Sequence, residues 1–247
     1  MSGMRVLVAG ATGVIGGEIA AEAAARGATV VPAGRDRQRL ARVADRIGAS
    51  GSELFDAYDL DTCAALAARA AERTSGLDAV LVAFGAVAFG HAEQLPLAIQ
   101  EHLMTVNALG PMAVLGGALS VLGPGGAMGA LTGVVVDRPF PAMASYRASK
   151  SALAAWLGAV RVEQHARRIS VLDARLPHLD TGFAQRAVSG SIPAMPPGAD
   201  LNLWVNAVLD GLTRGTAVLA PSAPTGPTAL PGSVQRPRHF DSHGGAV

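Results

Sequence analysis

The sequence predicts an α/β fold: a single doubly wound domain with a parallel sheet of about seven strands and helices on both faces. Apolar runs of strand length alternate along the chain with amphipathic stretches of helical length. The runs are almost continuous Val, Leu and Ala, as strands buried on both faces require. With 247 residues, 50% of them hydrophobic, the chain is long enough to bury one large core.

The elements follow one another in a regular order. Apolar runs predict strands at 4–10, 28–33, 52–58, 77–84, 126–136, 168–176 and 216–222. Helices are predicted up to about residue 26, at 35–48 and 61–76, through 107, around 146–150 and near 201–212. The composition then shifts to Pro, Gly, Ser and Thr. We therefore expect one domain over 1–222 and a poorly ordered tail over 223–247.

Charge and composition narrow the classes of function. A net charge of +1, with 16% charged residues, leaves no basic surface for nucleic acid or an anionic membrane. The uncharged stretch Leu103–Val136 is interrupted by Asn107 and Pro111, so it predicts a buried helix and strand rather than a membrane span. The single Cys63 excludes an internal disulfide, and with no signal peptide predicted it favours the cytoplasm. The six histidines show no metal-ligand spacing, so no metal is expected.

A glycine-rich turn follows the first predicted strand, in "VLVAGATGVIGGEIA". Its glycines are spaced G-x-x-G-x-x-G and would let the backbone approach a pyrophosphate at the N-terminus of the next helix. A turn required only for close helix–strand packing is the alternative. In an alternating α/β chain the pattern favours a Rossmann-like dinucleotide site. The residues expected around the pyrophosphate are Gly10, Thr12, Gly13, Val14, Ile15 and Gly16.

The end of the second strand bears on which dinucleotide binds. It reads Ala33-Gly34, without the carboxylate that would bond the ribose of NAD, and Arg35 follows at once. An arginine there can bind a 2′-phosphate through two hydrogen bonds. Asp36 could bond a ribose, or it could cap the next helix. We expect NADP(H) to be favoured over NAD(H).

The stretch "YRASK" contains Lys150, the only lysine in the chain, four residues after Tyr146. Residues at i and i+4 of a helix lie on one face, so both side chains would point into the same space. A nearby ammonium favours a phenolate and lowers the pKa of a tyrosine toward neutrality. The pair is therefore a candidate for proton transfer, with an exposed surface pair as the alternative.

Together with the glycine turn and "TVNALGPMAV", the "YRASK" stretch resembles the short-chain dehydrogenase/reductase family, from about Arg5 to Ala220. The resemblance implies an NAD(P)-dependent oxidoreductase that moves a hydride between nicotinamide and a carbonyl or secondary alcohol. It implies that Tyr146 is the general acid/base, that Lys150 bonds the nicotinamide ribose, and that Asn107 binds a water of the proton relay. Further cofactor contacts implied by the resemblance are Asp59 with Leu60 near adenine, Phe84 and Gly85 in the cofactor wall, and Thr181 near the carboxamide.

Three positions depart from the family pattern. The catalytic serine usually lies thirteen residues before the tyrosine, where this chain has Gly133. Thr132 is a candidate substitute, but strand alternation should turn it away from that position. The segment after the fourth strand reads "AFGA" instead of Asn-Asn-Ala-Gly, and the middle glycine of the first turn is shifted to Gly13. We expect cofactor binding to survive, while catalytic competence depends on what replaces the serine.

A substrate loop is expected at about 178–200, with the pocket between Phe89–His91 and His178–Pro197. The second segment is rich in Ala, Ile, Met and Pro, which predicts a largely apolar small molecule. His91 and His178 could orient it, or be ordinary loop histidines. The uncharged helix Leu103–Leu122 and the Ala-rich helix after Lys150 predict a homodimer or homotetramer. Alternatives to the oxidoreductase are an NADP(H)-binding sensor or scaffold with little turnover, and a non-redox enzyme resembling an epimerase or dehydratase.

Overall fold

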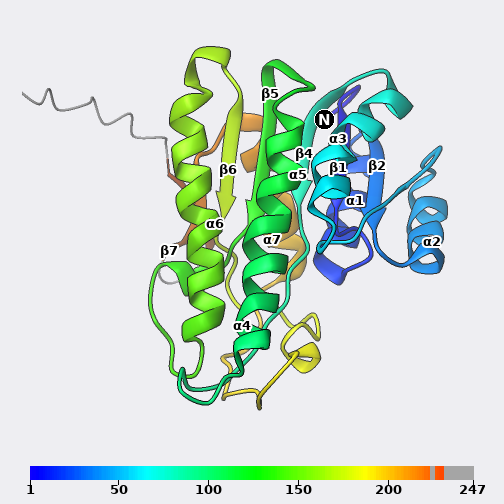
Figure 1. Cartoon of the computed structure of the whole chain (residues 1–247). Coiled ribbons are helices and arrows are strands. Elements are labelled where there is room, and N and C mark those ends of the chain that lie inside the picture. Colours follow the sequence, from blue (N-terminus) through cyan, green and yellow to red (C-terminus); the bar gives the residue numbers. More distant parts are fainter. Residues whose placement is uncertain (223–225, 231–247) are drawn as a thin grey trace, which may run out of the picture.

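The computed structural model describes residues 1–222 and 226–230, and it places one sheet between two layers of helices (Figure 1). In this part of the chain the sheet has eight strands in the order β3-β2-β1-β4-β5-β6-β7-β8. Neighbours run parallel except β7 and β8, which are antiparallel. The predicted doubly wound α/β fold is confirmed. The strands are β1 (Arg5–Ala9), β2 (Thr29–Gly34), β3 (Glu53–Leu54), β4 (Leu77–Val82), β5 (Leu122–Leu131), β6 (Ser170–Ala174), β7 (Val218–Ser222) and β8 (Gly226–Leu230).

Helices connect the parallel strands. They are α1 (Val14–Ala25), α2 (Arg37–Ile47), α3 (Leu60–Thr74), α4 (Leu97–Met104), α5 (Gly110–Ala118), α6 (Ala144–Glu163) and α7 (Leu201–Arg214). A π-helical turn, η1 (Thr105–Leu109), joins α4 to α5, and short 3₁₀ turns occur at η2 (Val134–Val136), η3 (His165–Arg167) and η4 (Ala184–Arg186). None of the helices described is both long and apolar enough to cross a membrane.

Side chains of the central strands alternate between two cores, as burial on both faces requires. Leu7 and Ala9 of β1 join a cluster with α3, α5 and α6, whereas Val6 and Val8 join a cluster with α1 and α7. The predicted near-continuous apolar strands therefore reflect two separate cores on opposite faces of one sheet.

The strand order reverses between β1 and β4, which pair with each other in the middle of the sheet. At such a switch point the connections leave in opposite directions and open a crevice at the carboxyl ends of the strands. The Gly10 N–H donates to Ala33 O at 2.8 Å and the Ala83 N–H donates to Ala9 O at 2.7 Å, so both loops begin side by side. The predicted glycine turn therefore lies at this crevice.

Two predicted strands have wrong boundaries. The strand expected over 126–136 ends at Leu131, because Gly133 takes a positive φ of 108° and a 3₁₀ turn follows. The strand expected over 52–58 is reduced to Glu53–Leu54. Within the expected tail, Gly226–Leu230 forms β8, which pairs with β7. The rest of that tail, residues 223–225 and 231–247, lies outside the described part, so its poor order stays a prediction.

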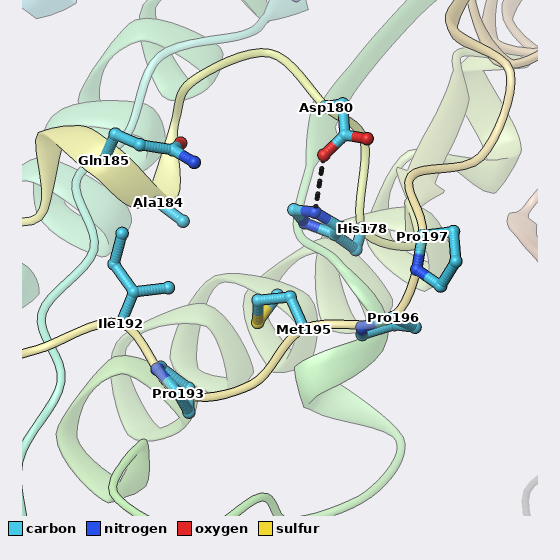
Figure 2. Close-up of a pocket in the computed structure, with 9 residues that line it drawn as sticks. All are labelled: His178, Asp180, Ala184, Gln185, Ile192, Pro193, Met195, Pro196 and Pro197. Carbon is cyan, nitrogen blue, oxygen red and sulfur yellow. Dashed lines mark hydrogen bonds and ion pairs between the residues drawn. The ribbon is translucent and has the colours of Figure 1, made fainter.

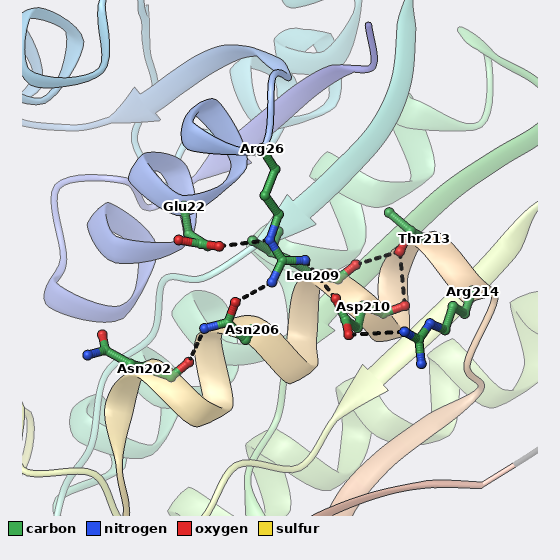
Figure 3. A network of polar contacts seen from close by, with 8 residues as sticks. All are labelled: Glu22, Arg26, Asn202, Asn206, Leu209, Asp210, Thr213 and Arg214. Carbon is green, nitrogen blue, oxygen red and sulfur yellow. Dashed lines mark hydrogen bonds and ion pairs between the residues drawn. The ribbon is translucent and has the colours of Figure 1, made fainter. Parts of the chain in front are cut away.

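A polar network ties α1 to α7 on one face of the sheet (Figure 3). Arg26 pairs with Glu22 at 2.8 Å and with Asp210 at 2.6 Å, and it also donates to the side-chain oxygen of Asn206. Asp210 lies 3.4 Å from Arg214, one turn further along α7. The helix that carries the glycine turn is thus attached to the last helix by polar contacts as well as by the apolar core.

Candidate active site

In the glycine turn between β1 and α1, backbone atoms approach one another closely. Gly10 has φ 96°, and a Cβ there would lie 2.7 Å from the Phe84 nitrogen. A Cβ on Gly16 would lie 2.3 Å from the Gly10 oxygen, too close for any side chain. Gly13 occupies the N-cap position of α1 with an ordinary φ of −83°. Gly10 and Gly16 are therefore required by the fold of the turn, whatever binds there.

The N-terminus of α1 has no side-chain cap. By contrast, Asp36, Asp59 and Asp200 cap α2, α3 and α7 through their carboxylates. Val14 and Ile15 are the first residues of α1, and Val14 is 41% exposed. Uncapped N–H groups at the positive end of a helix favour an anion. The arrangement fits the predicted pyrophosphate site.

The end of β2 carries the residues expected to select the dinucleotide. A Cβ on Gly34 would lie 2.7 Å from Cγ2 of Thr12, so Thr12 packs directly against this strand end. Arg35 is exposed and makes no hydrogen bond or ion pair with the residues that the structure describes. Asp36 accepts from the N–H groups of Gln38 and Arg39, each at 3.0 Å, and these bonds lower the pKa of its carboxyl. Asp36 is a helix cap, and Arg35 has no partner among the described residues, so its contact with a 2′-phosphate stays a prediction.

The predicted adenine side of the crevice is bordered by aromatic and acidic residues. The Phe84 and Phe55 ring centroids lie 5.0 Å apart. Asp59 is exposed and accepts from the Thr62 N–H at 3.0 Å, so it caps α3 in addition to any contact with adenine. Leu60, the first residue of α3, is also exposed. The adenine contact of Asp59 stays a prediction.

Asn107 lies in the π-helical turn η1 and is fully buried. Its Oδ1 accepts from the Ala86 N–H and its Nδ2 donates to the Ala86 carbonyl, both at 2.8 Å. The same Nδ2 donates to Ser149 Oγ at 3.0 Å, and that hydroxyl donates to the Tyr146 carbonyl. Asn107 therefore holds the loop after β4 against the helix that carries Tyr146. Ser149 was not singled out from the sequence, although it lies inside "YRASK".

Lys150 of α6 lies beside Asn107 and the loop after β4. Its Nζ donates to the Leu131 carbonyl at 3.0 Å. A Cβ on Gly85 would lie 3.1 Å from this Nζ and 2.9 Å from Asn107 Oδ1, so both polar groups approach the chain where it has no side chain. Burial lowers the pKa of Lys150 to about 8, and the charge of Asp173 opposes this shift. The structure thus brings together Gly85, Asn107 and Lys150.

Tyr146 packs between two small apolar clusters above the sheet. One contains Val87, Phe89 and Ala184, and the other contains Ala88, Leu95 and Leu103. Its hydroxyl makes no hydrogen bond to any described residue, and burial raises the pKa of the phenol. We expected Lys150 to lower that pKa, and for the free protein this is wrong. The ammonium bonds a backbone carbonyl, while desolvation of the phenol dominates.

The position of the missing serine is occupied by a turn whose conformation favours glycine. Gly133 has φ 108° and ψ 158°, a region that an L-residue rarely adopts. Thr132 is buried, and its hydroxyl donates to Asp173 Oδ1. In the free protein the hydroxyl of the candidate substitute is therefore already bonded to a carboxylate. That Thr132 does not directly replace the serine stays a prediction.

A pocket of about 450 Å³ lies beside the segment after β6 (Figure 2). Its lining is apolar except for His178, Asp180 and Gln185. His178 Nε2 lies 3.1 Å from Asp180 Oδ1. The remaining lining residues are Ala184, Ile192, Pro193, Met195, Pro196 and Pro197.

The other side of the expected pocket differs from the prediction. Phe89 does not line this pocket, because its side chain is buried in the cluster with Val87 and Ala184. Its N–H donates to the Ser189 carbonyl at 2.9 Å. A Cβ on Gly190 would lie 1.7 Å from the Phe89 oxygen. His91 is exposed and does not line the pocket. The loop after β4 therefore contacts the segment at Ser189 and Gly190 through its backbone.

Thr181 follows the pocket residues His178 and Asp180. It is 9% exposed, and its hydroxyl makes no hydrogen bond with the described residues. Its contact with a carboxamide stays a prediction. No group of His, Cys, Asp or Glu that could hold a metal ion occurs within 1–222 and 226–230.

Comparison with known proteins agrees with this architecture. The sequence model of the short chain dehydrogenase family matches residues 4–191, and the chain therefore belongs to this family. A short chain dehydrogenase from Burkholderia cenocepacia J2315, solved in complex with NADP, superposes with a TM-score of 0.79 at 24% identity, covering 88% of this chain and 96% of that one. A dehydrogenase/reductase from Sinorhizobium meliloti 1021 gives 0.77 at 23% identity, covering 88% and 92%. BdcA in complex with NADPH gives 0.73 at 24% identity, covering 86% and 88%.

Proposed function

We propose that the protein is an NADP(H)-dependent oxidoreductase that moves a hydride between nicotinamide and the carbonyl or secondary alcohol of a largely apolar small molecule. The observation that carries the proposal is the meeting of Gly85, Asn107 and Lys150 at the switch point of the sheet. Tyr146 lies one helical turn before Lys150, with a hydroxyl free to bind a substrate oxygen. Membership of the short chain dehydrogenase family supports the same chemistry.

The residues present fit a dinucleotide. The uncapped N-terminus of α1, with Gly10, Gly13 and Gly16 before or within its first turn, would hold the pyrophosphate. Lys150 would bond the ribose next to nicotinamide, and the hydroxyl of Thr181 would bond the carboxamide. When bound, the nicotinamide supplies or accepts the hydride.

Tyr146 would move the proton. Because burial raises the pKa of its phenol, the free protein holds it protonated at neutral pH. A protonated phenol can donate to a carbonyl oxygen as the hydride arrives. Carbonyl reduction is therefore the direction to assay first. The pocket beside His178 combines Ala, Ile, Met and Pro side chains with the polar groups of His178, Asp180 and Gln185. Such a lining suits an apolar molecule that carries a polar group, as a carbonyl compound does.

The first experiment separates turnover from binding. Titration of the purified protein with NADPH should saturate, and a screen of apolar ketones and aldehydes should find one that consumes the reduced cofactor. Tyr146→Phe should bind NADPH normally and lose about a hundredfold or more in kcat. Unchanged activity in Tyr146→Phe would exclude the proposed proton donor.

The choice of NADP(H) rests on Arg35, and three of the similar structures contain NADP or NADPH. Losing a charge-assisted bond to the 2′-phosphate should cost about 1.5–3 kcal/mol, so Arg35→Ala should weaken NADPH by about tenfold to a hundredfold. NADH should be affected little. Arg37→Ala, an exposed neighbour on α2, is the matched control. If the NADPH/NADH affinity ratio of Arg35→Ala equals that of the wild type, Arg35 does not select the cofactor.

A second candidate function is an NADP(H)-binding sensor or scaffold with little turnover. The observation that favours it is the loss of a side-chain donor at Gly133, while the Thr132 hydroxyl bonds Asp173. An enzyme lacking one such donor typically loses about a hundredfold to a thousandfold in rate. Tight NADPH binding without consumption across the carbonyl screen would favour this function.

The oligomer is the remaining part of the proposal. Leu97 of α4 is 68% exposed and Val162 of α6 is 78% exposed, and Met104 and Leu109 are exposed nearby in the sequence of the α4–α5 segment. These apolar side chains support a homodimer or homotetramer. Light scattering at micromolar concentration should give a multiple of 24.9 kDa; the monomer mass would contradict it. A buried thiol, Cys63, is consistent with the cytoplasm as the expected compartment.

A further inference from the structure

Asp173 is a carboxylate in the middle of the sheet, on β6, and only 1% of it is exposed. Burying a carboxylate is costly unless it is paired and hydrogen-bonded. Its Oδ1 accepts from the Thr132 hydroxyl, and its Oδ2 lies 2.8 Å from Nε of Arg175. The sequence carries the signal as a lone acid in the apolar run "VLDA", and nothing in the function proposed above uses it.

Strand register places Asp173 on the same side of the sheet as the catalytic helix. Ala130 of β5 is opposite Asp173, and Ala130 and Val171 pack in one cluster with residues of α6. Side chains two apart on a strand share a face, so Thr132 and Asp173 continue that face. Lys150 reaches it from α6 and donates to Leu131, the residue directly before Thr132. Lys150 and Asp173 therefore hold consecutive residues at the end of β5.

Lys150 needs a counter-charge at this place. Only 5% of the residue is exposed, and a buried ammonium without a partner tends to lose its proton. The one bond its Nζ makes with the described residues is to a neutral carbonyl. Asp173 is the charged group that favours the protonated form of Lys150, while Tyr146 is uncharged at neutral pH.

The other charged groups around Asp173 do not take over this role. Arg161 of α6 donates to the carbonyls of Val171 and Ala217, at 3.0 and 2.7 Å. Arg175 shares its charge between Asp173 and Asp137, the residue after η2. On α4, which also packs against α6, His102 bonds Tyr58. Asp173 thus balances cations from two elements.

We propose that Asp173 is a positioning residue: its buried carboxylate keeps Lys150 charged and, through Thr132, fixes the end of β5 to which Lys150 is bonded. The effect of Asp173 on the charge of Lys150 is a property of the protein without ligands. The importance of that charge for ribose binding and catalysis rests on the function proposed above. In this way the chain orders the strand end that carries Gly133 in place of a serine.

The single lysine makes the test direct. Protein grown with lysine labelled with ¹³C at Cε, and carrying no lysine in its tag, gives one ε-carbon resonance whose pH titration reports Lys150 alone. We expect a wild-type midpoint near 8, the pKa to which burial lowers it. Asp173→Asn keeps the shape and can still accept from Thr132, but it loses the charge and the bond from Arg175. The midpoint should therefore fall by about one unit.

Two further variants control the measurement. Glu53→Gln removes a carboxylate that is similarly buried, 7% exposed and bonded to Arg69 and Arg73, but lies on the far edge strand β3. It should leave the Lys150 midpoint unchanged. Arg175→Gln removes a cation from Asp173 and should raise the midpoint. If Asp173→Asn does not fold, the shift of the Lys150 midpoint in Arg175→Gln tests the proposal.

The outcomes separate the two proposals. The role of Asp173 is supported if the Lys150 midpoint falls in Asp173→Asn or rises in Arg175→Gln, while it is unchanged in Glu53→Gln. A midpoint that moves in neither variant, or that moves equally in Glu53→Gln, overturns it. NADPH titration of the same proteins should show affinity declining with pH at the Lys150 midpoint and earlier in Asp173→Asn. Absent NADPH binding with an intact lysine response would instead defeat the proposed function.

Discussion

The turn between β1 and α1 and the carboxyl edge of β5 and β6 form two parts of one crevice by different means. The turn is made from backbone: Gly10 and Gly16 approach so closely that neither tolerates a Cβ, and no side chain caps the helix. The β5–β6 edge is made from buried ionisable groups, with Lys150 and Asp173 on neighbouring elements. The first region is built without a charged side chain, whereas the second region holds its charges at a cost in solvation.

The two regions meet at the loop after β4. Phe84 lies against Gly10, and Gly85 lies against Asn107 and Lys150. Successive residues of one loop therefore touch the proposed cofactor turn and the proposed catalytic groups. The comparison implies that the first region should be sensitive to added atoms and the second to changed charge. Three predictions test this contrast, in order of expected effect.

Gly16→Ala should break the turn. Its Cβ would lie 2.3 Å from the Gly10 oxygen, a backbone atom that cannot move without shifting the loop. We expect a loss of about 3 kcal/mol in the free energy of unfolding, measured with urea, together with weaker NADPH binding. Gly158→Ala is the control, because no atom lies within 4 Å of its Cβ, and helix propensity should stabilise it by up to about 1 kcal/mol. Equal stability of Gly16→Ala and the wild type would refute the steric argument.

Lys150→Met should reveal the cost of the buried ammonium through its pH dependence. Lysine is charged in the unfolded chain up to its ordinary pKa of 10.5, but in the folded protein it loses its proton near 8. Below pH 8 Lys150 is charged in both the folded and the unfolded state, so the folded state bears the full free-energy cost of burying the ammonium. This cost disappears as the pH rises from 8 to 10.5. The stability of the wild type relative to Lys150→Met should therefore increase by about 3 kcal/mol over that range.

The measurement is urea unfolding of both proteins at several pH values. Tyr146 titrates in both proteins. Its contribution therefore cancels in the stability difference, provided that the substitution at Lys150 leaves the pKa of Tyr146 unchanged. A stability difference that stays constant with pH would mean that burial does not perturb Lys150.

Thr132→Val should have the smallest effect on turnover. It removes the hydroxyl that bonds Asp173, and the lost bond to a charged group should lower stability by about 1.5–3 kcal/mol. Because the hydroxyl is already bonded to Asp173, kcat with any accepted carbonyl should fall less than about tenfold, far below the loss typical of a removed oxyanion donor. Thr132→Ser should restore stability. A hundredfold loss of kcat at unchanged stability would make Thr132 the substitute for the serine.

The sequence predicted the parts whose signal is local. Alternating apolar runs predicted the strand and helix order, and the spacing of Gly10, Gly13 and Gly16 predicted a tight turn before α1. The interpretation of Asp36 as a helix cap is also confirmed. Each of these follows from residues close together in the chain, through backbone sterics or local hydrogen bonds. The end of β5 was missed because Gly133 could have continued an apolar strand, and only its conformation shows otherwise.

By itself, the amino-acid sequence determined the doubly wound fold, the glycine turn and the placement of Tyr146 and Lys150 on one helix face, since periodicity and spacing set these locally. Only the tertiary structure decided the electrostatics of the site. It packs the half-buried Tyr146 ring against two clusters, directs Lys150 to a carbonyl, and brings Asp173 beside Thr132, 41 residues away in the chain. Solvation and charge depend on neighbours that folding assembles from distant segments, so spacing along the chain cannot specify them.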